Sequence, residues 1–261
     1  MTWMRCHGGR ELALIDKQGQ EQLTLTFDSH VNGMSTVYDN TLLICGVEDR
    51  DIKQIILPSG KVTSVFSIGK LYPYHVCKPP SGDLYVTVLD SIDYKVTIDS
   101  ERALVRYSPL GREKGRARYD RRGDPLFVGP FRVRFSNTED VIGVINNTDE
   151  DNNHLVLLNA DLTLRLRYLG NGKVVLGEEK FDTTTYKPET KYAIRDFIFH
   201  SFENIIICEY FSRCVRLLSK DCVPMCTLLQ TQEHIPMSMT MNGDEVWLGF
   251  IDGTVKVYKY K

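Results

Sequence analysis

Long hydrophobic runs and helical periodicity are almost absent from this 261-residue sequence. No stretch of 18 apolar residues occurs, so we expect no membrane-spanning segment and no membrane partner. Neither sign of charge dominates: 32 Lys and Arg stand against 34 Asp and Glu, for a net charge of −2. This balance argues against a general polyanion binder and against a disordered acidic tail. With 42% hydrophobic residues, the chain can instead form one all-β domain with a substantial core.

Cysteine is uncommon and odd in number, with seven residues. Most lie in strand-like runs, among them Cys45, Cys77 and Cys208, which favours buried reduced thiols and predicts a cytoplasmic protein. Cys222 and Cys226 have a loose metal-ligand spacing, but no second pair accompanies them. The sequence therefore predicts no metal site and no cofactor.

Short apolar runs bounded by Gly, Pro, Asn and Asp are what the chain has in abundance. Residues 203–229 contain three such runs, joined by a polar corner and a turn, and a fourth run precedes them. The four runs are Ile194–Phe199, Ile205–Cys208, Val215–Leu218 and Val223–Leu229. Four strands in about 40 residues, recurring along a chain, are typical of a propeller blade.

The same unit repeats along the whole chain and predicts a single all-β domain over residues 1–261, a six-bladed β-propeller. Its first and last blades are expected to be incomplete, lacking the innermost and the outermost strand respectively. Propellers normally close by letting one terminus complete the blade at the other end, so we expect the missing strands upstream of Met1, in a longer protein or in the parent of a truncated product. The approximate blade boundaries are 1–27, 28–69, 70–120, 121–170, 171–230 and 231–261.

The stretch from Ser81 to Phe127, SGDLYVTVLDS followed by ALVRYSPLGREKGRARYDRRGDPLF, resembles the NHL-repeat propeller of the tripartite-motif (TRIM) type proteins, in particular the invertebrate B-box and NHL set. The segments ENIIICEYFSRCVRLLSKDC and TWMRCHGGRELALIDKQG are similar to the same repeat. The acidic residue that ends the second strand is kept as Asp90 and Glu209 and lost in the other units.

This resemblance implies a non-catalytic protein-interaction module that recruits a substrate or partner for a TRIM-like ubiquitin-ligase protein. Any ligase activity, and oligomerisation through a coiled coil, would reside in upstream domains absent from this chain. The chain itself is therefore predicted not to be an enzyme.

A partner-binding face is predicted at one end of the central channel, where innermost strands begin and second strands end. Tyrosine and arginine are the residue types favoured at interaction hot spots. In the alternative interpretation these residues have only structural roles: the tyrosines cap the core between blades, and Arg195 pairs with Asp196 or Glu209. The predicted binding residues are Tyr72, Tyr74, Arg132, Arg195, Tyr210, Arg213 and His234.

A basic cluster in the sequence REKGRARYDRRGD suggests single-stranded RNA as an alternative partner. Acidic residues interrupt the cluster, and its place on an outermost strand favours a solvated edge that discourages sheet pairing. Its members are Arg112, Lys114, Arg116, Arg118, Arg121 and Arg122.

A third hypothesis is a calcium-dependent propeller hydrolase of the lactonase kind, which needs oxygen ligands where the innermost strands begin. Among these positions only Asp196 is acidic, and no histidine lies in a Ser-His-Asp setting, so no catalytic residue is predicted. The acidic loop Asn146–Asn153 lacks the Gly and Glu of an EF-hand and is expected to be a solvated loop. The long segment Asn171–Tyr192 is expected to contribute to partner recognition.

Overall fold

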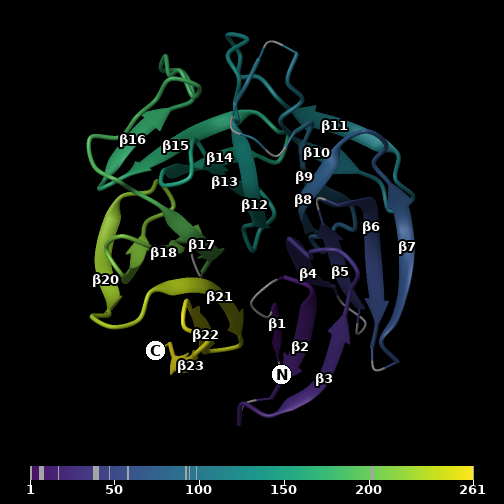
Figure 1. Ribbon diagram of the computed structural model, residues 1–261. Coiled ribbons are helices and arrows are strands. Elements are labelled where there is room, and N and C mark those ends of the chain that lie inside the picture. The colour runs from purple at the N-terminus through teal and green to yellow at the C-terminus, as the bar shows by residue number, and fades with distance from the viewer. Residues whose placement is uncertain are drawn as a thin grey trace. The chain divides into compact units, whose positions relative to one another are not determined.

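A computed structural model of the chain is all-β (Figure 1). It describes residues 2–5, 9–16, 18–37, 41–46, 48–57, 59–91, 93, 95–97, 99–200 and 203–260. These residues form six antiparallel sheets, each built from consecutive strands. They divide into two compact units, Met1–Arg118 with Gly129–Val133, and Tyr119–Val128 with Arg134–Lys261. No helix in the described ranges has the length and hydrophobicity needed to cross a membrane.

The first unit contains three sheets, in the orders β1-β2-β3, β4-β5-β6-β7 and β11-β10-β9-β8. Tight turns at Gly19, Gly60 and Gly111 join neighbouring strands, and each of these glycines has a positive φ. The strands are β1 (Thr2–Arg5), β2 (Glu11–Ile15), β3 (Glu21–Thr26), β4 (Gly33–Val37), β5 (Thr41–Gly46), β6 (Asp49–Ile56), β7 (Lys61–Ser67), β8 (Tyr72–Cys77), β9 (Leu84–Leu89), β10 (Ala103–Tyr107) and β11 (Glu113–Ala117).

The remaining sheets have the orders β12-β13-β14-β15-β16, β17-β18-β19-β20 and β21-β22-β23. Strand β12 (Gly129–Phe135) runs from residues of the first unit into residues of the second. The other strands are β13 (Val141–Asn147), β14 (Asn153–Asn159), β15 (Leu164–Gly170), β16 (Lys173–Leu176), β17 (Ile194–Phe199), β18 (Ile205–Glu209), β19 (Cys214–Leu218), β20 (Pro224–Gln230), β21 (Pro236–Asn242), β22 (Glu245–Phe250) and β23 (Val255–Lys259).

The core lies between successive sheets within each unit. The second strands β9, β13 and β18 are buried at nearly every position, which explains their continuous apolar sequences. In the second unit, Ile206 and Leu217 of one sheet pack with Met239 and Leu248 of the next. Each such buried side chain contributes about 1.5–3 kcal/mol to folding. Outer strands such as β3 and β20 are mostly exposed.

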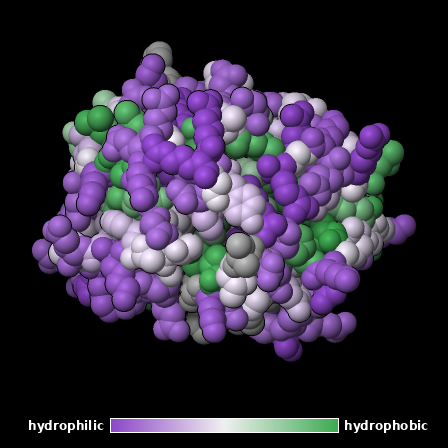
Figure 2. All heavy atoms as spheres, turned by 90° about the horizontal axis from the view of Figure 1, so that it is seen from above, coloured by the Kyte–Doolittle hydropathy of each residue, from purple (hydrophilic) through white to green (hydrophobic). Residues whose placement is uncertain are grey.

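The surface shown in Figure 2 is mostly hydrophilic, with hydrophobic residues in separate groups. Large exposed apolar side chains include Leu110 in the turn after β10, and Val223 and Met225 next to or in β20. Single exposed apolar residues of this kind are ordinary on a protein surface and define no binding site by themselves.

The predicted all-β propeller architecture is confirmed, and the first and last sheets have only three strands, as expected. The prediction of six blades is not confirmed. A blade needs four strands, and within the described residues only four of the six sheets have four or five. The sequence also missed β16, a fifth strand that the long segment after residue 170 adds to its sheet.

Candidate functional site

The turn between β18 and β19 forms the base of a candidate binding site in the second unit. Strand β18 ends at Glu209, and the chain reverses over the next four residues, with the Arg213 amide donating to the Tyr210 carbonyl at 3.2 Å. Arg213 has φ 50°, a conformation that helps a short turn reverse the chain. The Tyr210 amide donates to the Ala193 carbonyl at 2.8 Å, which ties this turn to the segment that leads into β17.

Arg195 lies over the ring of Tyr210, with 4.2 Å between its guanidinium carbon and the ring centroid. Next to this pair, Phe211 meets Tyr210 edge-on at 5.1 Å, and the Lys191 ammonium lies 5.8 Å from the Phe211 centroid. Within the part of the chain that the structure describes, the half-buried Arg195 side chain has no hydrogen-bond or ion-pair partner, and its Nε is fully buried. We call Lys191, Arg195, Tyr210, Phe211 and Arg213 the corner site.

The loop before β21 continues the same surface. The Arg213 Nη1 donates to the Gln232 carbonyl at 2.6 Å, and the Arg213 carbonyl accepts from the Thr231 amide at 3.0 Å. The Thr231 hydroxyl in turn donates to the His234 carbonyl, and His234 Nδ1 lies 2.6 Å from Asp252 Oδ2. Four predicted binding residues, Arg195, Tyr210, Arg213 and His234, are therefore linked within one unit.

A buried polar layer supports the corner site. The Glu209 carboxylate is 1% exposed and accepts hydrogen bonds from the Tyr192 hydroxyl at 3.2 Å and from Arg216 Nη2 at 3.1 Å. The Cys214 thiol lies 3.3 Å from the same carboxylate, and burial together with this negative charge raises its pKa to about 11. Cys214 therefore remains a protonated thiol at neutral pH and does not act as a nucleophile.

The alternative that Arg195 pairs with an acidic neighbour is wrong. Asp196 bonds to Arg134, at 3.0 Å between Oδ2 and Nη2, and it also accepts from the Met239 amide at 2.8 Å. Glu209 forms an ion pair with Arg216, as described above. Arg195 is the extra residue of a β-bulge between Ile194 and Asp196, and Asp196 is fully buried whereas Arg195 is only partly buried.

The other three predicted binding residues lie in the first unit, where each has an aromatic or cationic neighbour. The Arg50 guanidinium is 5.0 Å from the Tyr72 centroid, and its Nη2 is 3.4 Å from the Tyr72 hydroxyl. Tyr74 packs on Phe131 at 5.3 Å, and Arg132 lies 5.6 Å from the Phe131 centroid. Their membership in one binding face with the corner site stays a prediction.

Three of the six residues of the basic cluster are paired with carboxylates of the first unit. Arg116 makes ion pairs with Glu113 at 2.8 Å and with Glu101 at 2.7 Å. Arg118 shares Glu101 at 2.7 Å, and Lys114 lies 2.6 Å from Asp83. The remaining members, Arg112, Arg121 and Arg122, are exposed. Paired cations release few counterions on meeting a phosphate backbone, so the pairing of Lys114, Arg116 and Arg118 weakens the RNA hypothesis.

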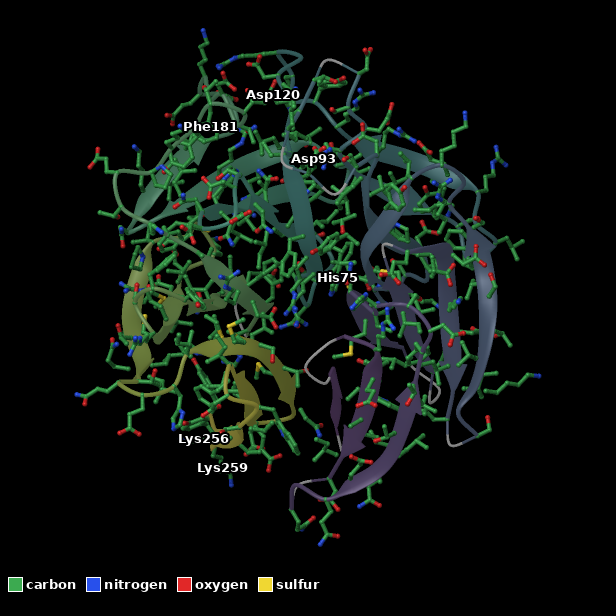
Figure 3. All side chains as sticks on the ribbon, viewed as in Figure 1. His75, Asp93, Asp120, Phe181, Lys256 and Lys259 are labelled. Carbon is green, nitrogen blue, oxygen red and sulfur yellow. The ribbon has the colours of Figure 1, made fainter. Side chains whose placement is uncertain are left out.

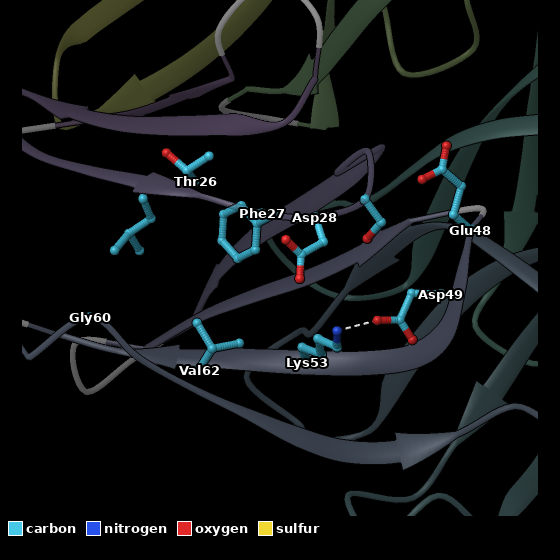
Figure 4. A pocket seen from close by; sticks show the side chains of 10 residues that line it. Thr26, Phe27, Asp28, Glu48, Asp49, Lys53, Gly60 and Val62 are labelled. Carbon is cyan, nitrogen blue, oxygen red and sulfur yellow. Dashed lines mark ion pairs between the residues drawn. The ribbon is translucent and has the colours of Figure 1, made fainter.

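The described part of the first unit also contains a pocket of about 490 Å³, which the sequence did not predict (Figure 4). Phe27 and Val62 line its apolar part, and Asp28, Asp49 and Glu48 its polar part. Asp49 forms an ion pair with Lys53, and Glu48 lies 2.9 Å from His30 Nδ1. Most of its charge is thus already partnered, and the pocket offers less to a charged ligand than the corner site does.

No three His, Cys, Asp or Glu side chains come together as metal ligands in the described ranges. In the acidic loop, Asp149 Oδ1 accepts from the Asp151 and Asn152 amides at 2.8 and 2.7 Å, and so shapes the loop itself. Cys222 is buried, with a pKa raised by burial to about 12, whereas Cys226 is exposed.

No protein-family model and no curated protein matches the sequence. Similar solved structures are β-propellers of low sequence identity. A chain of the nidogen–laminin complex is 11% identical, with 96% of this chain and 86% of that chain covered and a TM-score of 0.63. A gluconolactonase of Xanthomonas campestris is 16% identical, with 92% and 75% covered and a TM-score of 0.62. The calcium-binding regucalcin of Agrobacterium tumefaciens is 14% identical, with 95% and 77% covered and a TM-score of 0.62.

These similarities show that the chain is a β-propeller. They correct the prediction of a TRIM-like interaction module, because the similar structures are mostly enzymes and calcium-binding propellers such as the gluconolactonase and regucalcin. No family model supports a TRIM or ubiquitin-pathway identity. Since enzymes are among the neighbours, the predicted lack of enzymatic activity is not confirmed either.

Proposed function

We propose that this protein is a ligand-binding β-propeller whose corner site holds the negatively charged group of a small molecule. One observation carries the proposal: the Arg195 guanidinium is half-buried and fixed over Tyr210 at 4.2 Å, without a carboxylate partner among the described residues. A desolvated cation of this kind is stabilised when an anion binds to it.

The surroundings of Arg195 suit a planar anion with an apolar part. A guanidinium donates two parallel hydrogen bonds to a carboxylate or phosphate, and the Tyr210 ring holds it in one orientation. The Phe211 ring, 38% exposed, offers an apolar surface beside it. Arg213 and Lys191 add positive charge, although Asp151 partly neutralises Lys191. Because these groups rest on strands and a tight turn, binding costs little ordering entropy.

The neighbours support a small-molecule ligand only in general terms, since one of them is named as a gluconolactonase and another as a calcium-binding protein. No reaction is proposed for the corner site, because Cys214 is a protonated thiol and Glu209 is enclosed by its own partners.

Two further assignments accompany this proposal. An NHL-type repeat is supported by the sequence pattern of Ser81–Phe127. A cytoplasmic location is supported by the free thiols of Cys45, Cys77 and Cys208.

Calorimetric titration with benzoate and phenyl phosphate tests the proposal. We expect binding that weakens by about tenfold or more in Arg195→Gln and less in Arg195→Lys, which keeps the charge but loses the forked geometry. Arg165→Gln is the matched control, because Arg165 pairs with Asp221 on another strand of the same unit. No binding of either compound at millimolar concentration, or equal binding by wild type and Arg195→Gln, would contradict the proposal.

A further inference from the structure

The segment 177–190 forms a strap between β16 and β17. Side chains anchor its middle: Phe181 packs with Leu169 and Val175, and Tyr186 packs on Phe181 at 5.0 Å. The hydrogen bonds found within residues 178–190 are local, for example from the Tyr186 amide to the Asp182 carbonyl at 3.1 Å. The Gly177 amide donates to the Arg165 carbonyl at 2.9 Å and the Glu179 amide to the Leu176 carbonyl at 3.0 Å, so only the part after Glu179 can lift without breaking one of the backbone hydrogen bonds found between the strap and the sheets.

Beneath the strap lies Arg167 of β15, which is completely buried. Its Nε, Nη1 and Nη2 all lack a hydrogen-bond partner among the described residues. The nearest carboxylate oxygen is Asp120 Oδ2, 3.9 Å from Nη2, which is beyond hydrogen-bond distance. The guanidinium carbon is 5.0 Å from the centroid of Phe181 in the strap. Figure 3 labels Asp120 and Phe181, the two residues that approach Arg167 from neighbouring segments.

Two further side chains carry buried donors, and His154 is near enough to Arg167 for the positive charge to act on it. The Val128 amide donates to Asn146 Oδ1 at 2.8 Å, so the Asn146 amide nitrogen faces His154 Nε2 at 3.4 Å. His154 Nε2 is then the acceptor, and the proton lies on Nδ1, which is buried without a partner. The Thr183 hydroxyl of the strap is also buried without a partner, and the His154 ring meets Phe181 at 5.7 Å.

Five donor atoms on Arg167, His154 and Thr183 lack a hydrogen bond among the described residues, whereas nearly all buried polar groups in proteins have one. A buried guanidinium without one strongly destabilises the fold. A group rich in acceptors and negatively charged would satisfy all three side chains at once. Asp120 and Asp124, the carboxylates that act electrostatically on Arg167, come from the turn beside it and limit how much negative charge the site accepts.

We propose that Arg167, His154 and Thr183 form a binding site for an oxyanion, and that residues 177–190 are its cover, closed here by Phe181. Opening of the cover exposes the guanidinium, the oxyanion takes up the free donors, and the cover returns over it. Burial together with the positive charge of Arg167 lowers the pKa of His154 to about 3, so His154 serves as a neutral donor at physiological pH.

Thermal unfolding and amide hydrogen exchange of the wild-type chain with inorganic phosphate test the site without any substitution. At saturating phosphate we expect the Tm to rise by about 3 °C relative to chloride of equal ionic strength. Amide exchange in residues 177–190 is expected to slow at the same time. Sulfate and acetate, as further arms, distinguish a tetrahedral oxyanion from a carboxylate.

Arg167→Met separates a ligand site from a structural ion pair. If the guanidinium awaits an anion, this variant abolishes the phosphate response, because the group that would bind the oxyanion is gone. Phe181→Ala, which loosens the cover, should speed exchange of residues 177–190 in the absence of phosphate. Arg165→Met, two positions earlier on β15 and paired with Asp221, is the matched control and should keep the phosphate response.

The proposal is overturned if none of the three anions changes the Tm or the exchange of wild type, or if Arg167→Met keeps the phosphate response. A lower Tm for Arg167→Met, with no response of wild type, would show that Asp120 alone satisfies the guanidinium. Arg195→Gln keeps the phosphate response if the covered site is separate from the corner site, so the two proposals fail independently.

Discussion

Asp196 is a single carboxylate that joins three innermost strands of the second unit. It is fully buried on β17. Its carboxylate accepts hydrogen bonds from Arg134 of β12, through Nε at 3.2 Å and Nη2 at 3.0 Å, and from the Met239 amide of β21 at 2.8 Å. It also accepts the Phe197 amide at 2.8 Å. The Arg134 Nη2 donates to the Met239 carbonyl at 3.1 Å, so the same pair satisfies both backbone groups of Met239 on β21.

Asp196→Asn keeps the shape of this side chain but removes its charge and two acceptor positions. We expect a loss of about 3 kcal/mol in the free energy of unfolding, because Arg134 is left without its carboxylate in a largely buried place. Urea unfolding followed by tryptophan fluorescence measures the loss. The control is Glu113→Gln, which breaks the more exposed pair with Arg116 and should cost at most about 1 kcal/mol. Equal losses in the two variants would refute this role of Asp196.

His154 predicts a dependence of stability on acid pH. Its folded pKa is lowered to about 3, chiefly by burial, whereas the unfolded residue titrates near 6.5. The unfolded chain therefore takes up this proton first as the pH falls, and the stability present above pH 6.5 is lost between the two values. Between pH 7 and pH 5 the expected loss from this residue is about 2 kcal/mol. His154→Gln should remove that part of the pH dependence, measured as the difference between the wild-type and variant urea curves at pH 7 and 5. Parallel curves at both pH values would refute it.

At the scale of elements, the turn from β15 to β16 shows how the long segment after residue 170 begins. Gly170, Asn171 and Gly172 all have positive φ, at 93°, 50° and 79°. A Cβ on Gly170 would lie 2.6 Å from the Tyr192 ring, which is too close for real atoms. Glycine is needed there both for the backbone conformation and for the approach of Tyr192, whose hydroxyl reaches Glu209 below the corner site.

Gly170→Ala is expected to destabilise the protein by about 3 kcal/mol, of which roughly 1–2 come from the left-handed conformation and the rest from the clash with Tyr192. Gly123→Ala is the matched control, because Gly123 has φ 86° but no atom within 4 Å of the added Cβ, so only the conformational part applies. The difference between the two variants in urea unfolding isolates the clash. If both variants lose the same free energy, Tyr192 does not confine this turn.

Over the whole molecule, metal binding depends on where the carboxylates lie rather than on how many there are. The chain has 34 Asp and Glu, yet many described carboxylates, such as Asp83, Glu101 and Glu209, are bound to arginine or lysine of their own unit. Hard cations need several oxygen ligands at one point, and no such group occurs in the described ranges.

We therefore expect millimolar Ca²⁺ and EDTA to leave the Tm of the purified chain unchanged within about 1 °C, since a ligand that does not bind the folded state does not shift unfolding. Differential scanning calorimetry measures this, with Mg²⁺ of equal ionic strength as control. A rise in Tm that is specific for Ca²⁺ and reversed by EDTA would revive the third hypothesis, a calcium-dependent hydrolase.

The strands could largely be read from the sequence, because their pattern is local. Apolar runs such as Ile205–Cys208 and Leu84–Leu89 lie between turn residues, and such runs form buried strands. The sequence also singled out Arg195, Tyr210 and the segment after residue 170. It could not assign the strand β16, because Lys173–Leu176 is short and gains its place by pairing with β15.

The partners of the charged residues were decided by the tertiary structure. Arg195 has Asp196 beside it in sequence, yet Asp196 bonds to Arg134, 62 positions away, while Arg195 is the extra residue of a β-bulge and lies over Tyr210. Arg167 reads in the sequence like any charged residue of an outer strand, and only the folding of the strap over β15 buries it. The sequence by itself determined which segments become strands, since that depends on neighbours a few residues apart. The fold decided which charges are satisfied and which remain available to a ligand, since that depends on segments far apart in the chain.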